Sequence, residues 1–373
     1  MRYLFYLIFG VLISCKESIV KDSSDYFSNL QFSVDTVIID PVDEIIFLKH
    51  QLLNSDMGTD GTYFYNFNVD DHTLEKVNLD ELRLEEKFPF EKEGPNGTGP
   101  GIGIMGVIDE SHVSITGMYH SSLFSMEGEK LMTVYYENFS LADWHSGGDL
   151  LMGSSVLLDP DSKRLYGLIQ EYEDKKFVLR VLHLEEYETS RVKLKSFDKM
   201  PEYSFMYYIG KSTIHQTPKV GIEKFGKKVI LSNEITSALM WYDTEVDSLF
   251  MKSYTSQLTA NQKEKEYRKV YETPEEYRVE YARYKQEINF MPPFWDRDGQ
   301  LFLRFSYIEN ESRTDVFLTA YDAELNQLGE TFVPQLTKRP AKHFAKDGKI
   351  WIYENMNDEM GFVRLKIQRE IYF

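Results

Sequence analysis

Residues 239–249 read Leu-Met-Trp-Tyr-Asp-Thr-Glu-Val-Asp-Ser-Leu. An apolar segment is followed by a polar turn that opens at Asp243, and Leu249, six positions later, begins a second apolar segment. Short apolar runs on either side of a polar turn are typical of two adjacent β-strands. The near-constant recurrence of this unit indicates an internal repeat. Its five turns open at Asn68, Ser125, Glu186, Asp243 and Asp322, at spacings of 57, 61, 57 and 79 residues.

A second unit, a polar turn followed by an alternating strand, lies upstream of most copies. Residues 297–299, which precede the strand-like residues 301–305, are one example. Each period of the repeat therefore holds about four strands, which is the content of one blade of a β-propeller.

The two ends of the chain complete the count of blades. Residues 362–367 look like a last strand, and residues 32–40 have strand character but no neighbouring partner. If the N-terminal strand completes the C-terminal blade, few strand edges stay exposed. We therefore expect an all-β fold in which residues 31–373 form a six-bladed β-propeller closed by the N-terminal strand. An open β-sandwich or two smaller β domains is the alternative.

The longest spacing contains an insertion at residues 257–287, and this insertion has helical character. Residues 259–262 and 273–276 both match capping boxes, and Pro274 suits the first position of a helix. We expect a helical hairpin here, which covers exposed blade edge or serves as a lid or partner-docking element. Its apolar stripe would comprise Tyr277, Tyr281, Tyr284 and Ile288.

The composition sets limits on the class of protein. The chain has 373 residues, of which 42% are hydrophobic and 27% charged, and its formal net charge is −18. Such a chain can bury a large core. An acidic balance has the wrong sign for binding phosphates, so we expect no nucleic-acid partner.

The N-terminus resembles an export signal. Residues 3–13 form an apolar run behind one positive charge, which is too short to span a bilayer but suits the signal peptide of residues 1–14. The run ends in Leu-Ile-Ser-Cys, which resembles the lipobox of bacterial lipoproteins, and Cys15 is the only cysteine. We expect acylation of Cys15, a tether over residues 15–30, and a membrane as partner through the acyl chains. An ordinary buried thiol or a short anchor is the alternative.

The lipobox, the six-blade count and two short motifs together resemble a known family. The motifs are Glu-Gly-Pro-Asn-Gly at residues 93–97 and Asn-Phe-Met-Pro-Pro-Phe-Trp-Asp at residues 289–296. The chain is similar to an uncharacterised family of Bacteroidetes lipoproteins, a domain of unknown function with a TolB-like six-bladed fold. The resemblance implies a lipid-anchored location in the bacterial cell envelope, at the outer membrane, the periplasmic face or the cell surface. It carries no catalytic residues.

No motif in the chain predicts a specific chemistry. The glycine-rich residues 94–103 lack the lysine and the following helix of a phosphate-binding loop, and they predict a loop between blades. The eight histidines are scattered, with no metal-binding or catalytic spacing. Carboxylates from different blades could still assemble to cleave a glycosidic bond. We expect no metal, no cofactor and no assigned catalytic residue.

The sequence favours a binding or scaffolding role, with an envelope protein, a peptide or a glycan as ligand. The alternative is an envelope hydrolase acting on glycan or peptide, with His145, His215 or His343 as acid–base groups. Docking of a partner through residues 257–287 is a third hypothesis. The candidate ligand-binding residues are polar or aromatic side chains expected near the starts of inner strands, where aromatic rings stack on ligands and arginine binds anions. They are Trp144, His145, Asp149, Tyr207, His215, Trp295, Asp296, Arg297, Arg339 and His343.

Overall fold

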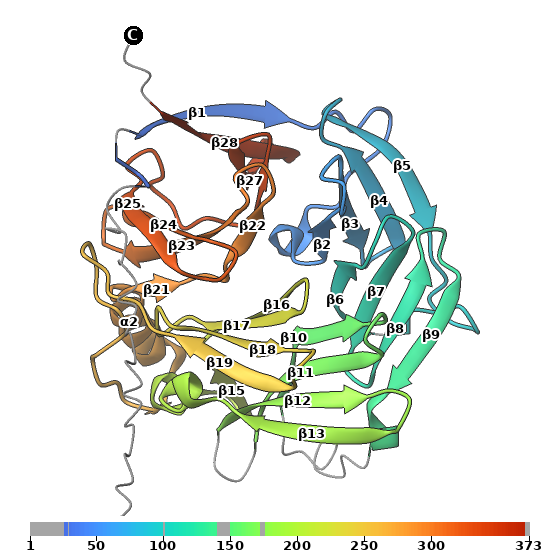
Figure 1. Cartoon of the computed structure of the whole chain (residues 1–373), viewed down its shortest axis with the longest axis horizontal. Helices are drawn as coiled ribbons and strands as arrows, with labels where there is room; N and C mark the ends of the chain where they lie inside the picture. Colours follow the sequence, from blue (N-terminus) through green and yellow to red (C-terminus); the bar gives the residue numbers. More distant parts are fainter. Residues whose placement is uncertain (1–25, 29, 100, 140–149, 172–175, 370–373) are drawn as a thin grey trace, which may run out of the picture.

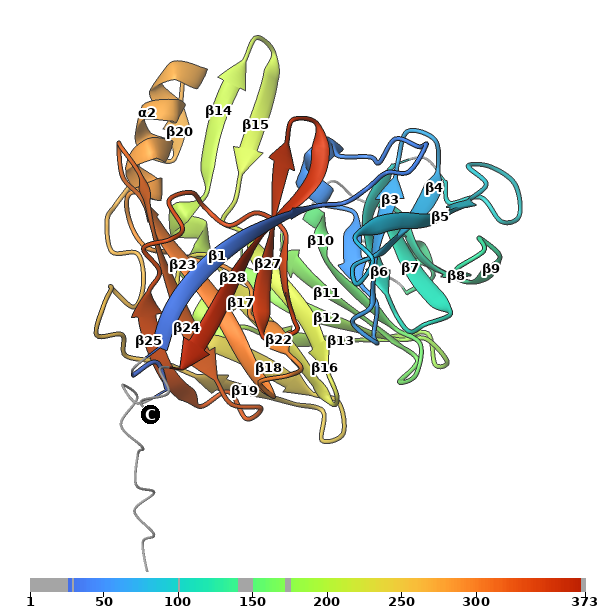
Figure 2. The same ribbon diagram turned by 90° about the horizontal axis from the view of Figure 1, so that it is seen from above.

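The computed structural model describes residues 26–28, 30–99, 101–139, 150–171 and 176–369. These residues form mostly β-strands in antiparallel sheets, which Figure 1 shows arranged around a common centre. Among the described residues, six sheets have four or more strands. A seventh, smaller sheet and the helix α2 project together from one end of the molecule (Figure 2). The predicted all-β class is confirmed.

Each of the first four large sheets is formed by four strands that are consecutive in the chain. The first contains β2 (Ser55–Met57), β3 (Tyr63–Asn68), β4 (Thr73–Asn78) and β5 (Arg83–Pro89). The second contains β6 (Ile102–Val107), β7 (His112–Gly117), β8 (His120–Ser125) and β9 (Lys130–Tyr135). The third contains β10 (Leu150–Asp159), β11 (Arg164–Gln170), β12 (Phe177–His183) and β13 (Glu188–Lys193). The fourth contains β16 (Val220–Phe225), β17 (Lys228–Asn233), β18 (Leu239–Asp243) and β19 (Ser248–Lys252).

The remaining sheets are less regular. The fifth contains β21 (Asn289–Phe290), β22 (Phe294–Asp296), β23 (Leu301–Glu309), β24 (Thr314–Tyr321) and β25 (Gln327–Phe332). The sixth contains β26 (His343–Lys346), β27 (Lys349–Met356), β28 (Glu359–Arg369) and β1 (Leu30–Ile38). The small sheet contains β14 (Phe205–Ile209), β15 (Ser212–Gln216) and β20 (Val270–Tyr271), and β14 pairs with β20 in parallel. The described helices are α2 (Pro274–Lys285) and the 3-10 turns η1 (Lys49–Leu52), η2 (Tyr136–Phe139), η3 (Lys195–Phe197) and η4 (Met200–Tyr203).

Turn chemistry explains the repeat that is visible in the sequence. Oδ1 of Asp243 accepts hydrogen bonds from the backbone amides of Glu245 (2.9 Å) and Val246 (3.3 Å). Short polar side chains bind nearby backbone in this way and initiate turns. The chain then passes through a left-handed residue, Asp247, with φ of 48°. The turns that open at Asn68 and Asp322 contain the same kind of hydrogen bond.

The first and last strands of the chain lie side by side, as predicted. β1 pairs with β28 in an antiparallel register that runs from Leu30 opposite Arg369 to Ile38 opposite Gly361. Arg364 of β28 donates two hydrogen bonds to Asp35 of β1, at 2.5 and 2.9 Å, and the hydrogen bond from this guanidinium lowers the pKa of Asp35. The first and the last described strands therefore belong to one sheet.

The body of the protein begins slightly before the predicted boundary at residue 31. Phe27 is buried in an apolar cluster with residues of β23, β24, β27 and β28. Phe27 therefore belongs to the folded body, although it lies within residues 15–30, which the sequence predicts as a tether. The predicted signal peptide and Cys15 lie outside the described residues.

The N-cap of the second predicted capping box is confirmed. Oγ1 of Thr273 accepts a hydrogen bond from the backbone amide of Glu276 at 3.2 Å, and Pro274 is the first residue of α2. Tyr277 and Tyr284 of this helix are buried against Phe205 of β14, with ring centroids 6.2 and 5.5 Å away. The predicted apolar stripe thus attaches the helix to the small sheet.

The first predicted capping box is wrong, because residues 259–262 are not helical. Oδ1 of Asn261 accepts the backbone amide of Ser256 at 2.7 Å, and its carbonyl accepts the amide of Ser237 at 2.8 Å. Side-chain bonds to nearby backbone and pairing with another segment compete with helix formation. The expected helical hairpin is therefore one helix preceded by a non-helical segment.

Aromatic packing joins the first sheet to the sixth. Phe362 of β28 is fully buried, and its ring lies 5.8 Å from Phe64 of β3 and 5.7 Å from Trp351 of β27. Replacing a buried phenylalanine by alanine costs about 3–5 kcal/mol. This contact is therefore a major part of the junction between the two ends of the chain.

We expect Phe362→Ala to lower the free energy of unfolding by about 3–5 kcal/mol in denaturant titrations. The matched control is Lys366→Ala on the same strand, where the side chain is exposed, and which should change stability by less than about 0.5 kcal/mol. Equal effects of the two substitutions would contradict the junction described above.

Candidate functional site

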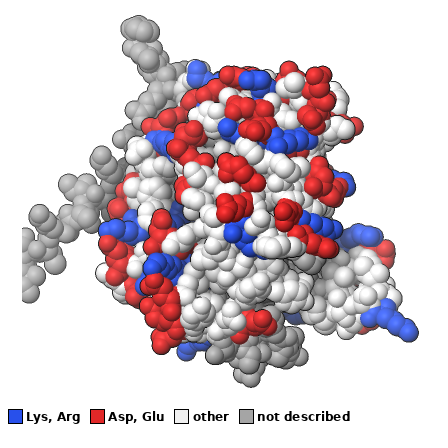
Figure 3. Space-filling view, turned by 90° about the vertical axis from the view of Figure 1, so that its right-hand side faces the viewer, with Lys and Arg blue, Asp and Glu red and all other residues white. Residues whose placement is uncertain are grey.

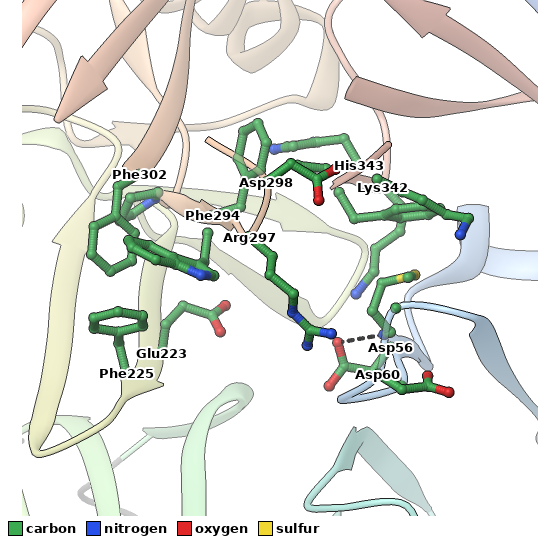
Figure 4. A pocket seen from close by; sticks show the side chains of 18 of the residues that line it. Asp56, Asp60, Glu223, Phe225, Phe294, Arg297, Asp298, Phe302, Lys342 and His343 are labelled. Carbon is green, nitrogen blue, oxygen red and sulfur yellow. Dashed lines mark hydrogen bonds between the residues drawn. The ribbon is translucent and has the colours of Figure 1, made fainter. Parts of the chain in front are cut away.

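A cavity lies near the centre of the sheet arrangement, beside strands at the inner edges of four sheets. Its volume is about 300 Å³. It is lined from within residues 56–61 at β2, 223–225 at the end of β16, 293–298 around β22 and 342–347 around β26, together with Phe302. Figure 4 shows side chains from these separate strands pointing into one space. We call this space the mouth cavity.

One wall of the mouth cavity is aromatic. The ring of Trp295 lies 4.2 Å from that of Phe225 and 4.8 Å from that of Phe302, measured between centroids. Successive residues of a strand point to opposite faces, so Glu223 and Phe225 share one face of β16. Figure 4 shows these two side chains beside each other. An apolar surface of tilted and edge-on aromatic rings therefore adjoins a carboxyl group.

Arg297 extends into the cavity from the turn after β22 and is exposed. A Cβ at position 61 would lie 3.7 Å from its Nη1 atom, so the guanidinium reaches the turn that follows β2. Within the part of the chain that the structure describes, this guanidinium has no hydrogen bond or ion pair. Lys342 donates to the carbonyl of Ser55 at 2.6 Å. Two cationic groups in the cavity thus lack a carboxylate partner among the described residues.

The two other lysines of the lining are paired with carboxylates. Lys224 forms an ion pair with Asp159, and Lys346 forms one with Asp80. The free positive charge of the mouth cavity therefore comes from Arg297 and Lys342.

Glu223 lines this cavity, and its carboxyl group has a raised pKa. Its side chain is exposed to water inside the cavity. The walls of the cavity nevertheless surround the carboxyl group with protein and reduce its hydration. Loss of hydration raises the pKa of Glu223 to about 7, the negative charge of Asp56 adds to this effect, and the positive charge of Lys342 opposes it. Perturbed carboxyl groups in a cavity are typical of functional sites.

Asp56 is positioned by the neighbouring sheet. Its Oδ2 atom accepts the backbone amide of Val107 at 3.0 Å, and its Oδ1 atom accepts that of Met57 at 2.9 Å. These bonds fix the carboxylate at the edge of the cavity.

Three of the predicted site residues follow one another in the chain, and two of them line the cavity. Trp295 and Arg297 line it, whereas Asp296 points to the other face of β22 and accepts the amide of Asp298 at 3.1 Å. Burial raises the pKa of Asp296. Its role is to form the turn that presents Arg297.

His343 also lines the cavity, but in a neutral state. Its Nδ1 atom lies 2.7 Å from the carbonyl of Ala341, and its ring lies 4.8 Å from that of Phe294. Burial lowers the pKa of His343 to about 4. At neutral pH this pKa leaves the side chain of His343 uncharged.

The other described candidates lie away from the mouth cavity. Tyr207 stacks on Tyr277 of α2, with centroids 4.3 Å apart and planes at 13°. His215 is exposed on β15. Arg339 lines a smaller cavity, about 30 Å³, near the start of β16. The predicted group is therefore divided between the two ends of the inner strands. Trp144, His145 and Asp149 lie outside the described residues.

The smaller cavity adjoins a buried ion pair. Lys285 of α2 donates to Glu234 at 2.7 Å, and both side chains are buried. Burial alone would raise the pKa of Glu234, but the charge of Lys285 lowers it to about 2. Both charges are satisfied within the protein, so this cluster fastens α2 to the fourth sheet.

Two further features of the described residues bear on function. No described helix has the length and apolar character needed to cross a membrane. No three His, Cys, Asp or Glu side chains of the described part gather in a way that could hold a metal ion. Figure 3 shows acidic and basic side chains intermixed on the right-hand side of Figure 1.

The repeated antiparallel sheets around a central cavity define a mostly β protein built from one repeated unit. The chain belongs to the family DUF4221, a domain of unknown function, whose model matches residues 24–332. The predicted membership in a family of unknown function is confirmed.

Two solved structures share the fold. One is a member of the DUF4221 family from Bacteroides vulgatus, with a TM-score of 0.66 and 11% identity, over 92% of this chain and 100% of that chain. The other is a candidate exported protein of Bacteroides fragilis, with a TM-score of 0.52 and 10% identity, over 93% of this chain and 97% of that chain. No curated protein matches the chain.

We expect the carboxyl group of Glu223 to titrate near pH 7, against about 4.3 for an unperturbed glutamate. Asp56→Asn should lower this pKa because a like charge is removed, and Lys342→Met should raise it because an opposite charge is removed. Carbon-13 NMR of labelled glutamate carboxyls measures the titration, and Glu223→Gln identifies the signal. Titration near pH 4 in the unsubstituted protein would contradict the electrostatics of the cavity.

Proposed function

We propose that this protein is a ligand-binding scaffold whose ligand occupies the mouth cavity. The observation that carries the proposal is the convergence of four sheets on one space with an aromatic wall and the guanidinium of Arg297, which has no partner among the described residues. Concave sites with apolar walls and a few polar groups are typical of small-molecule and peptide binding. An unpaired arginine and a carboxyl of raised pKa are poor contributors to stability, which favours a role in recognition.

We further propose that the six large sheets are the blades of a TolB-like six-bladed β-propeller. In this arrangement β1 would complete the last blade as its outermost strand, as its pairing with β28 supports. A rigid ring holds loops from distant parts of the sequence around one site, which suits a binding module without chemistry of its own.

We propose that the mature protein is anchored in a bacterial envelope through acylated Cys15. The support comes from the sequence of residues 1–15 and from the description of one structural relative as a candidate exported protein. Residues 1–14 would be removed as a signal peptide, and the following residues would connect the lipid to the body that starts near Phe27. Several acyl chains would hold the protein on a membrane stably.

The ligand-binding proposal predicts that Trp295→Ala abolishes binding at the mouth cavity. Amino acids, peptides and sugars would be screened by thermal shift on the full-length chain in mild detergent. A hit should raise the melting temperature of the unsubstituted protein and of the control Trp241→Ala, since Trp241 on β18 lies outside the cavity lining. Loss of an aromatic contact should weaken binding by about tenfold or more. Equal binding by both variants would contradict the assignment of the site.

The anchoring proposal predicts that Cys15→Ser abolishes labelling by a clickable palmitate analogue in a bacterial host. The substituted chain should also leave the membrane fraction. Continued labelling of Cys15→Ser would contradict acylation at this position, because the chain has no other cysteine.

A further inference from the structure

The mouth cavity contains unsatisfied charges of both signs. Arg297 and Lys342 supply positive charge without a carboxylate partner among the described residues. Glu223 supplies a carboxyl group that accepts no hydrogen bond from the described part of the chain. Asp60 and Asp298 also line the space, and each accepts a backbone amide, from Thr62 and Gly348 respectively. A ligand of one charge would satisfy only part of this set.

A purely anionic ligand suits the cavity poorly. Asp56, Asp60, Glu223 and Asp298 would repel it, and a doubly charged phosphate would be repelled most. Like charges at short range repel more strongly beside protein than in bulk water, so these acids oppose binding of an anion. A purely cationic ligand would satisfy the acids but would leave the guanidinium of Arg297 without an acceptor.

The apolar part of the lining limits the ligand further. Phe225, Trp295 and Phe302 form a continuous aromatic surface next to Glu223. Such a surface gains from contact with an apolar or aromatic group, and it also favours an ammonium group over its face.

We propose, on the basis of the ligand-binding function above, that the mouth cavity binds a zwitterion with an apolar side chain, namely an amino acid or dipeptide. Its ammonium group is held by Glu223, its carboxylate by Arg297 with Lys342, and its side chain by the wall of Phe225, Trp295 and Phe302. A bidentate guanidinium–carboxylate contact is among the strongest polar contacts in proteins, which explains an arginine kept free at this place.

Binding of this ligand is linked to protons through Glu223. An ammonium group beside the carboxyl favours its ionised form, so binding releases a proton when Glu223 is protonated in the free protein. Because the pKa of Glu223 is about 7, affinity should rise as pH increases from 5.5 to 7. The charged groups that face Glu223 are Asp56, Lys342 and Arg297, and its neighbour Lys224 is paired with Asp159. With a pKa of about 4, His343 does not titrate in this range.

Two matched sets of probes test the proposal by isothermal titration calorimetry on the full-length chain. The first is L-phenylalanine, phenethylamine and 3-phenylpropionate, which share one ring and differ only in their charges. The second is alanyl-phenylalanine with its N-acetylated and C-amidated forms. A zwitterion should bind at least about tenfold more tightly than each of its singly charged analogues, because each analogue loses one charge-assisted contact.

Two substitutions separate the two ends of the ligand. Glu223→Gln should remove the advantage of the zwitterion over the carboxylate-only probe and abolish the pH dependence. Arg297→Gln should remove its advantage over the amine-only probe. Lys227→Gln, on an exposed turn outside the cavity lining, is the control and should leave the whole pattern unchanged. Circular dichroism would check that all variants are folded.

The outcomes distinguish this inference from the broader function. If neither zwitterion is preferred in either set, the inference is overturned. In that case a different ligand that depends on Trp295 would still support the mouth cavity as the binding site. If no ligand from the wider screen depends on Trp295, the proposed function itself fails.

Discussion

The pairing of β1 with β28 is the interaction on which the rest of the structure depends. It joins residues 30–38 to residues 361–369 across nearly the whole chain. Closing a loop of this length costs about 5 kcal/mol of chain entropy. A nine-residue ladder, the contacts of Asp35 with Arg364 and Lys349, and the buried ring of Phe362 against Phe64 oppose this cost. Beside this ladder, the first and sixth sheets are joined by aromatic packing and by polar contacts such as the hydrogen bond from Lys342 to Ser55.

The geometry of the mouth cavity depends on this arrangement, because its lining comes from strands far apart in the sequence. Lys342 of the sixth sheet binds the carbonyl of Ser55 in the first sheet, so the junction of the chain ends also forms part of the cavity wall. The fourth and fifth sheets are fastened by the buried Arg304, which donates to the carbonyls of Ser237 and Met291, both at 2.6 Å. A rigid frame can therefore hold Arg297 and Glu223 apart, without a partner from the described residues, which suits a binding site.

Much of the fold could be predicted from the sequence, because local chemistry decided it. The turn at Asp243 and the helix cap at Thr273 depend on residues a few positions away in the chain. Both could therefore be predicted from the sequence. The capping box at residues 259–262 failed because Asn261 binds Ser237, which lies far away in the sequence. The lining of the mouth cavity could be predicted only in part, for the same reason. Three predicted residues, Trp295, Arg297 and His343, lie in the cavity lining. The lining residues Glu223, Asp56 and Lys342 were not predicted, since nothing local shows which strand ends meet. One signal was available in the sequence: Glu223 and Phe225 alternate along β16, the first strand of the fourth sheet, and therefore share one face.

The central claim is that the two ends of the chain share one sheet, and a cysteine cross-link tests it most directly. Ser33 and Lys366 are exposed and directly opposite each other in the register of β1 and β28. In a Cys15→Ser background, Ser33→Cys with Lys366→Cys should form an intramolecular disulfide under mild oxidation and raise the unfolding temperature. The control pair, Ser33→Cys with Asp358→Cys at the far turn of the sheet, should stay reduced. Failure of the first pair to cross-link, while both thiols react with a small alkylating reagent, would contradict the account.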